Sequence, residues 1–345
     1  MHISTKLMAS AAIISTAGMA QATESLNVSA YGGSWGDALT SCVFKPFEAE
    51  TGISVLLEPS ASTVTLSKLQ AQASAPVIDV AWMDGGVSEL ARDSDVVAAI
   101  DPAMAPGLAG VAEQAKYKTD AGDIYAVGNG YFAIGLVYNT EEITTPPTSW
   151  EDLWNPDYAG RVILPSAVHS SGVPFLALVN TLAGGTLDDL TPGIEKMSTL
   201  KAALFFDSSG VANSGFQTGE GLIGAHAATQ AFTMADSGLP MAYVIPKEGA
   251  MASDIRIHIV KGTDDLEASH QLVDFAVQPA QAGCLAAALQ VGPATQDVDM
   301  PGDVAARMPW GPDGTIADLS VSDWTAINAH RDALTDAWNR IASGN

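Results

Sequence analysis

The stretch 146–162 constrains the fold of this chain most, because prolines, a capping pattern and an apolar stripe fall within one short segment. Two prolines at its start disfavour helix, and Thr148 and Glu151 have the spacing of a capping box. The tryptophans and leucine that follow lie on one helical face, which Pro156 ends. A turn then leads into Val162–Leu164, an apolar run typical of a buried strand. The segment therefore predicts a linker, a short helix and a strand.

The first 22 residues have the composition of a secretory signal peptide. Lys6 precedes an uncharged run from Leu7 to Met19, and Ala20-Gln21-Ala22 offers small residues for cleavage. No later stretch reaches the roughly 18 uncharged residues of a membrane-spanning helix. We therefore expect export to the periplasm, with cleavage near Ala22.

Charge and length narrow the classes of function. The chain has 345 residues, with 15 basic and 39 acidic side chains and a formal net charge of −24. Such a charge repels nucleic acid and anionic lipid, so we expect neither as a partner. The length and an apolar fraction of 47% are sufficient for two domains, each with its own core.

Two cysteines, Cys42 and Cys284, occur in a chain predicted to be exported to a compartment that permits oxidation. One disulfide is the economical interpretation, and two separate buried thiols are the alternative. Neither cysteine belongs to a C-x-x-C or Cys/His cluster, so we expect no metal site and no cofactor.

Strand and helix patterns alternate from residue 26 onward. The apolar stretches Leu26–Tyr31, Ile53–Leu57 and Val77–Met83 are typical of strands, and Trp35–Thr51 and Thr65–Ala73 have helical periodicity. This alternation predicts a largely parallel sheet covered by helices. Such sheets bind their ligands beyond the carboxyl ends of the strands.

The chain is predicted to cross three times between two lobes. Tyr125–Asn139 contains two apolar stretches around Gly128-Asn129-Gly130, and we interpret these glycines as a hinge whose dihedral angles vary on closure. A helix over Ser322–Ile341 carries an apolar stripe that should pack on the second lobe. The expected fold is α/β, with a mostly parallel sheet flanked by helices in each lobe and a ligand cleft at the hinge. The predicted boundaries are 23–129 plus 255–293 for the first lobe and 130–254 plus 294–345 for the second.

The segment 146–162 resembles the motif P-x-S-W-x-D-L-W-x-P-x-Y-x-G-R/K of bacterial solute-binding proteins of the spermidine/putrescine-binding type, which serve ABC importers. Further patches occur in the order found in that family: Phe47–Ile53, Asp79-Val80, Tyr138-Asn139, Gly219-Glu220, Tyr243–Gly249 and Gly292-Pro293. The resemblance implies a type II periplasmic binding fold. It also implies a monomeric binding protein that is not an enzyme and that docks on a membrane permease.

In polyamine-binding relatives, aromatic rings enclose the methylene chain of the ligand and carboxylates bind its amines. Trp35 and Asp84 fall on positions that contact ligand in those relatives. An ammonium group is attracted both to an aromatic face and to a carboxylate. The alternatives are that Trp35 anchors the start of a helix on its own lobe and that Asp84 caps the next helix.

The sequence departs from the polyamine pattern in its second half. Ser166–Ser171 replaces paired acids, Ala227-Ala228 replaces an aromatic residue, and Ala252-Ser253 replaces another. A smaller, more polar pocket is therefore expected, with a small amine or amino-acid-like zwitterion as ligand and a polyamine as the alternative. His169 is alternatively a hydrogen bonder at a helix start. The predicted ligand-binding residues are Ser34, Trp35, Asp84, Asn129, Tyr131, Ser166, His169, Ser170, Thr229, Gln230, Ser253 and Asp254.

Other classes of function have less support in the sequence. A Tyr-Tyr pair is absent, which disfavours an iron carrier, and the spacing of the acidic residues offers no specific catalytic pair, which disfavours a hydrolase. A binding protein that serves a chemoreceptor or scavenges solute without a transporter would use the same binding chemistry. The sequence does not exclude this alternative function. Arg256, in the predicted return strand, pairs either a ligand carboxylate or an acid of the protein.

Overall fold

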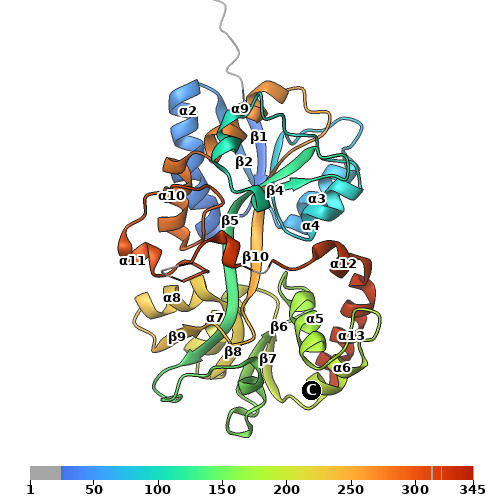
Figure 1. The fold of residues 1–345 in the computed structure, drawn as a ribbon, viewed down its shortest axis with the longest axis vertical. Coiled ribbons are helices and arrows are strands. Elements are labelled where there is room, and N and C mark those ends of the chain that lie inside the picture. Colours follow the sequence, from blue (N-terminus) through green and yellow to red (C-terminus); the bar gives the residue numbers. More distant parts are fainter. Residues whose placement is uncertain (1–24, 312–313, 320, 345) are drawn as a thin grey trace, which may run out of the picture.

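The computed structural model describes residues 25–311, 314–319 and 321–344. The predicted signal peptide, residues 1–22, lies outside them. The chain forms two α/β lobes stacked along the long axis of the molecule. Two long strands, β5 (Ile124–Asn139) and β10 (Met251–Ile259), run through both lobes (Figure 1). The expected two-lobed α/β architecture is confirmed.

One mixed sheet connects the lobes. Its strands run in the order β2-β1-β3-β10-β5-β8-β6-β7, and β4 and β9 pair with β5. The other strands are β1 (Ser25–Ala30), β2 (Ser54–Pro59), β3 (Val80–Asp84), β4 (Lys116–Lys118), β6 (Val162–Pro165), β7 (Ala202–Phe206), β8 (Ile223–Ala227) and β9 (Met241–Val244).

Parallel pairing is confined to the two outer parts of this sheet. β1 is parallel to β2 and β3, and β6 is parallel to β7 and β8. β5 and β10 pair antiparallel with each other and with their other partner strands. The alternation of strands and helices predicts only the parallel parts, because a parallel connection needs a crossover. Each lobe therefore has a mixed sheet rather than a mostly parallel one.

The glycines at the lobe junction have a packing role. β5 continues unbroken through Gly128 and Gly130, and neither glycine has a positive φ. A Cβ on Gly130 would lie 3.1 Å from the ring of Trp35, and one on Gly128 would lie 2.8 Å from the hydroxyl of Tyr131. These positions exclude side chains because the rings approach the strand closely, which gives the glycines a steric role in addition to the predicted hinge.

The first lobe buries the apolar faces of β1, β3 and β10 beneath its helices. Leu26, Val28, Trp82 and Ile257 are fully buried in this core.

Among the described helices, none by itself is long and apolar enough to cross a membrane, although the bent pair α9–α10 meets that test by length and composition. The helical elements are α1 (Gly33–Leu39), η1 (Thr40–Phe44), α2 (Lys45–Thr51), α3 (Ser62–Ala71), α4 (Val87–Asp93), η2 (Pro106–Gly110), η3 (Glu113–Ala115), α9 (Leu266–Ala276) and α10 (Pro279–Leu289).

The second lobe has its own core, in which Trp150, Phe175, Leu334 and Trp338 are buried. The C-terminal helix α13 packs against α5 and α6, as the apolar stripe predicts. The helical elements of this lobe are η4 (Trp150–Trp154), η5 (Pro156–Tyr158), α5 (Gly172–Leu182), α6 (Thr191–Ser198), α7 (Ser209–Gln217), α8 (Ala228–Asp236), α12 (Trp324–Ala329) and α13 (Arg331–Gly344). α11 (Gly302–Ala305) and η6 (Ile316–Asp318) belong to the segment that precedes α12.

The segment after residue 293 divides between the lobes, whereas the sequence assigns all of it to the second. Ala294 belongs to the first-lobe core, against which Trp310 and Ile316 also pack. Thr295 forms a bridge with Val111 of the same lobe. The chain therefore passes over the first lobe before α12 and α13 return to the second. Helical periodicity in the sequence identifies only α12 and α13, and not the part of the segment that lies on the first lobe.

The motif 146–162 forms the expected short helix and strand, with a cap shifted by one residue. The helix is η4, a 3-10 helix, and Ser149 caps it by accepting from the amide of Glu151 at 3.2 Å, while Asp152 accepts from the amide of Ser149 at 3.0 Å. The Ser149 hydroxyl also donates to Glu248 at 2.5 Å. This distant contact selects Ser149 over the predicted Thr148.

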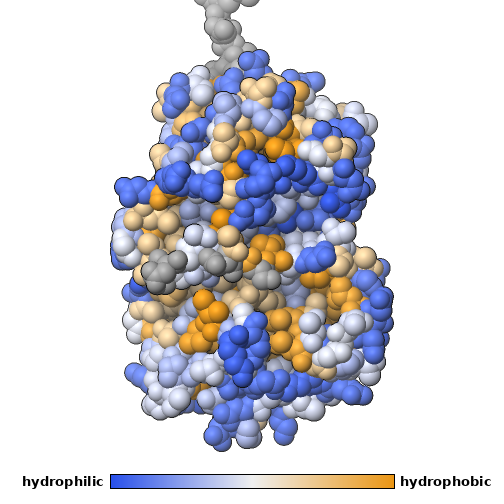
Figure 2. Space-filling model, viewed as in Figure 1, coloured by the Kyte–Doolittle hydropathy of each residue, from blue (hydrophilic) through white to orange (hydrophobic). Residues whose placement is uncertain are grey.

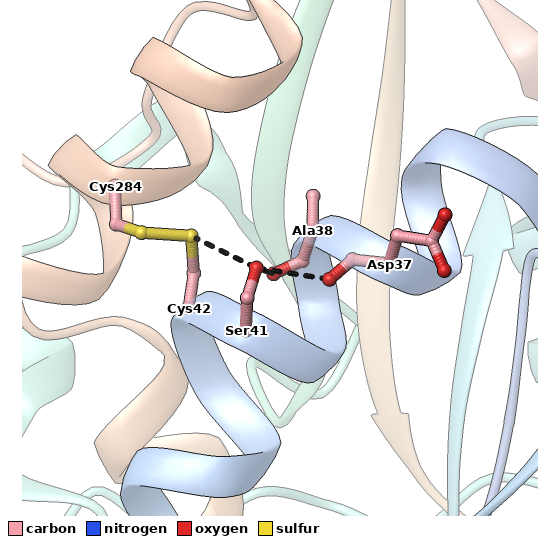
Figure 3. Close-up of a disulfide and its surroundings, with 5 residues drawn as sticks. All are labelled: Asp37, Ala38, Ser41, Cys42 and Cys284. Atoms are coloured by element: carbon pink, nitrogen blue, oxygen red, sulfur yellow. Dashed lines mark hydrogen bonds between the residues drawn. A yellow bond between two sulfur atoms is a disulfide. The ribbon is translucent and has the colours of Figure 1, made fainter.

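The two cysteines form a disulfide, which confirms the interpretation from the sequence. Cys42 in η1 and Cys284 in α10 have Cα atoms 5.6 Å apart and are 242 residues apart in the chain (Figure 3). The hydroxyl of the neighbouring Ser41 donates to the carbonyl of Asp37 at 2.9 Å. The bridge joins the first and last helices of the first lobe.

Candidate ligand-binding cleft

A cavity of about 230 Å³ opens between the lobes at the carboxyl ends of the outer strands. Figure 2 shows hydrophobic residues gathered around the narrow middle of the molecule on the face in view, with hydrophilic residues over most of both ends. The cavity is lined by Ala61, Ser62, Thr63, Asp84, Gly85, Val87, Ala167, Val168, His169, Ser170, Asp207, Trp324 and Arg331.

Asp84 is the acid of the first-lobe wall. It ends β3 and is half-buried. Its backbone amide donates to the hydroxyl of Ser62 at 2.9 Å, and that hydroxyl donates to Oδ2 of Asp84 at 2.9 Å. Since the Ser62 proton is used in this way, Tyr31 donates its own hydroxyl to Ser62 at 2.9 Å. The sequence predicts Asp84 as a site residue but not Ser62 and Tyr31, whose hydroxyls hold it in place.

Burial raises the pKa of Asp84 to about 6, and the hydrogen bond from Ser62 lowers it only in part. In the described chain no Lys, Arg or His forms an ion pair with this carboxylate. A half-buried carboxylate without a cationic partner is suited to accept a charged hydrogen bond from an ammonium group.

His169 lies on the second-lobe wall, in the turn before α5. Its Nδ1 accepts from the amide of Ser171 at 3.2 Å, which leaves the proton of the neutral ring on Nε2. Burial lowers the pKa of His169 to about 4. The imidazole is therefore neutral near pH 7 and offers an N–H donor. The structure places His169 both at the start of a helix and on the wall of the cavity.

Two residues of the wall come from the C-terminal helices. Trp324 begins α12 and is 5% exposed, and Arg331 begins α13. The indole packs on the turn after β3, where a Cβ on Gly85 would lie 2.4 Å from Nε1 of Trp324. Gly85 is required for this close approach, which joins α12 of one lobe to α4 of the other.

Asp254 and Tyr131 lie in a buried cluster at the lobe junction, behind the cavity. Nε of Arg256 contacts Oδ2 of Asp254 at 2.5 Å, and Nη1 of Arg256 contacts Oε1 of Glu89 at 2.6 Å. The hydroxyl of Tyr117 bridges Tyr131 and Asp254. Arg256 is thus occupied by acids of the protein, which decides between the two roles that the sequence left open.

The other predicted site residues do not line this cavity. Asn129 accepts from the indole of Trp82 at 2.8 Å, and Gln230 accepts from Asn213 at 2.8 Å. Trp35 packs on Tyr31, with ring centroids 5.8 Å apart, and on Gly130. The structure brings together only Asp84, His169 and Ser170. The remaining residues lie elsewhere: Ser34 is exposed in α1, Ser166 caps the following turn, Thr229 is in α8 and Ser253 is buried in β10.

Sequence reasoning missed Ser62, Asp207, Trp324 and Arg331. Asp207 directly follows β7, so the rule that ligands collect at the carboxyl ends of strands could have found it. Arg331 has no comparable local signal. Within residues 25–311, 314–319 and 321–344 no group of three or more His, Cys, Asp or Glu side chains is placed to hold a metal ion.

Two lobes, two crossing strands and one polar cavity between them define a solute-binding protein. A model of the family described as bacterial extracellular solute-binding protein matches residues 43–309. The spermidine/putrescine-binding periplasmic protein 1 of Haemophilus influenzae is 26% identical over 262 residues, 74% of this chain and 72% of that protein.

Solved structures are similar across nearly the whole chain. An ABC transporter from Clostridium perfringens has a TM-score of 0.78 at 22% identity, covering 92% of this chain and 99% of the other. The Atu4243–GABA receptor structure has a TM-score of 0.78 at 19% identity, covering 92% and 97%. These likenesses show the fold.

The chain belongs to the bacterial extracellular solute-binding protein family. It is therefore a non-enzymatic protein that binds a solute.

Proposed function

We propose that this protein is a monomeric periplasmic receptor that captures one small amine-bearing solute between its lobes and delivers it to an inner-membrane permease. Asp84 carries the proposal, because it is a half-buried carboxylate without a cationic partner on the cavity wall. The predicted signal peptide and the disulfide support a periplasmic location. In the proposed site, Ser62 orients Asp84, and His169 and Ser170 contact the solute from the second lobe.

The size of the cavity supports a small ligand. A volume of about 230 Å³ is below the range of about 300–1,000 Å³ common for drug-sized ligands. The name of the Haemophilus influenzae relative states spermidine and putrescine, and that of one solved structure states GABA. Each of these compounds contains an amine, which is the shared chemistry that Asp84 would bind.

Calorimetric titration of amines into the wild type and into Asp84→Asn tests this proposal. Loss of a charged acceptor should weaken amine binding about 10- to 100-fold. Asp37→Asn is the matched control, since Asp37 is an exposed acid of α1 outside the cavity. Equal affinities in wild type, Asp84→Asn and Asp37→Asn would rule out Asp84 as the amine site.

A further inference from the structure

The geometry points to a second, anion-binding half of the same cleft, formed by the guanidinium of Arg331 and the indole N–H of Trp324. This assignment rests on the proposed function and sharpens its ligand class. The solute is then an amine that also carries a carboxylate, and a plain diamine or polyamine is disfavoured.

Arg331 lines the cavity without forming an ion pair in the described chain. The nearby acid Glu89 is already occupied at both oxygens. Its Oε1 accepts from Arg256 at 2.6 Å, and its Oε2 accepts from the amide of Gly86 at 2.6 Å. Arg331 is half-buried and has no carboxylate of the described residues within ion-pair distance. Its charge is therefore free for a ligand.

Asn328 holds the guanidinium in place from the side away from its terminal nitrogens. Oδ1 of Asn328 accepts from Nε of Arg331 at 2.9 Å, and Nδ2 of Asn328 donates to the carbonyl of Gly86 at 2.7 Å. A Cβ on Gly86 would lie 3.2 Å from Nη2 of Arg331. The orientation of Arg331 is thus fixed against the first lobe, and its two Nη groups have no hydrogen-bond acceptor in the described structure.

Trp324 supplies the independent second observation. Its side chain is more than nine-tenths buried, and its Nε1 has no hydrogen-bond partner among the described residues. A buried donor without an acceptor destabilises the folded protein. Trp324 and Arg331 line the same cavity, so a ligand bound there lies beside both side chains. The unused indole donor points to a ligand that completes the site.

The charges of the cavity wall then define a pair of opposite sites. Asp84 and Arg331 line one cavity, and no ion pair joins them or links either to another residue of the described chain. A diamine would satisfy Asp84 and bring positive charge toward Arg331. An amino acid satisfies both, since a guanidinium binds a carboxylate through two parallel hydrogen bonds.

Matched pairs of probes that differ by a carboxylate test the assignment. We would titrate ornithine against putrescine, lysine against cadaverine and γ-aminobutyrate against propylamine. In the wild type the carboxylated member of at least one pair should bind more tightly. Arg331→Gln should weaken that member about 10- to 100-fold and leave its amine partner within about twofold. Arg331→Lys should retain part of the preference, because it keeps the charge and loses the planar fork.

Controls separate this assignment from folding and from the proposed function. Arg340→Gln, at an exposed position of the same helix, should behave as wild type, and thermal melts should show that each variant is folded. A wild type that binds no carboxylated probe more tightly than its partner overturns the assignment, as does an equal loss of both members in Arg331→Gln. If Asp84→Asn still abolishes amine binding in that case, only the anion half is wrong. Unchanged binding in Asp84→Asn contradicts the proposed function itself.

Discussion

Arg256 and Asp254 lie two residues apart on β10 and form an ion pair, with 2.5 Å between Nε and Oδ2, at the junction of the lobes. Both side chains are almost fully buried, and the guanidinium stacks on Tyr117 with 3.4 Å between its carbon and the ring centroid. The junction therefore contains an enclosed pair of charges whose partners come from β10, β4 and α4.

Removing one member of this pair should destabilise the protein strongly. Arg256→Met leaves Asp254 buried without its cation, and we expect a loss of about 3–5 kcal/mol in the free energy of unfolding. Denaturant titration measures it. As a control, Arg161→Met removes an exposed pair with Glu142 and should cost at most about 1 kcal/mol. Similar losses in the two variants would contradict the structural role of the buried pair.

The elevated pKa of Asp84 makes two properties depend on pH. Its folded value of about 6 lies above the ordinary 3.8, so ionisation opposes folding as pH rises through that window, and the cost is fully present above pH 6. Asp84→Asn should therefore raise the melting temperature of the ligand-free protein at pH 7.5 and leave it unchanged near pH 3.5. A lower melting temperature at pH 7.5 would count against this account.

The affinity for ligand should also depend on the ionisation of Asp84. It should rise with pH, whereas the stability of the ligand-free protein should fall. Below pH 6 an amine competes with a proton for Asp84, so affinity should fall about tenfold for each pH unit. Calorimetric titration from pH 4.5 to pH 8 measures this slope. Asp37→Asn should keep the slope, whereas Asp84→Asn should remove it.

The disulfide should be a large contributor to stability. Replacing Cys42 and Cys284 with Ser opens a loop of 242 residues, and the chain-entropy model gives a loss of about 5.5 kcal/mol. Denaturant unfolding of oxidised wild type and of the double variant measures the difference. Ser41→Ala, beside the bridge, is the control and should stay close to wild type. A double variant as stable as wild type would show that the bridge is dispensable.

Gly85 should tolerate no side chain. A Cβ there would lie 2.3 Å from Oδ1 of Asp254 and 2.4 Å from Nε1 of Trp324, so Gly85→Ala must displace α12 or β10. We expect a loss of about 1–3 kcal/mol, the range for overpacked sites. Gly302→Ala, where a Cβ meets open space, is the matched control. Thermal melts that show no difference between the two variants would contradict the close packing of Trp324.

Local patterns predict the elements and one wall of the site well. Period-two and buried-strand patterns find β1 to β3, and the family resemblance finds Asp84, which lies at the exit of a single strand. The continuity of β5 could not be predicted, since Gly128-Asn129-Gly130 has the composition of a break. The ring of Trp35, from α1, and the ring of Tyr131, on β5 itself, explain the glycines.

Contacts between distant segments explain the residues that sequence reasoning missed or misplaced. Arg331 reaches the cavity because Asn328 binds Gly86, a residue 242 positions earlier. Asp254 follows a family position for ligand contact, but Arg256 and Tyr117 enclose it. Ser149 replaces Thr148 as a cap because Glu248 lies beside it. None of these preferences is encoded within a window of a few residues.

β5 and β10 stay hydrogen-bonded to each other across the junction, from Met251 opposite Ile134 to Ile257 opposite Val127. Any rotation of one lobe against the other must therefore wind or unwind a two-stranded ribbon. Such a ribbon distributes torsion over many peptide bonds. It therefore opposes rotation of the lobes with a restoring torque. The stiffness of that ribbon determines how far the two lobes separate in the ligand-free protein.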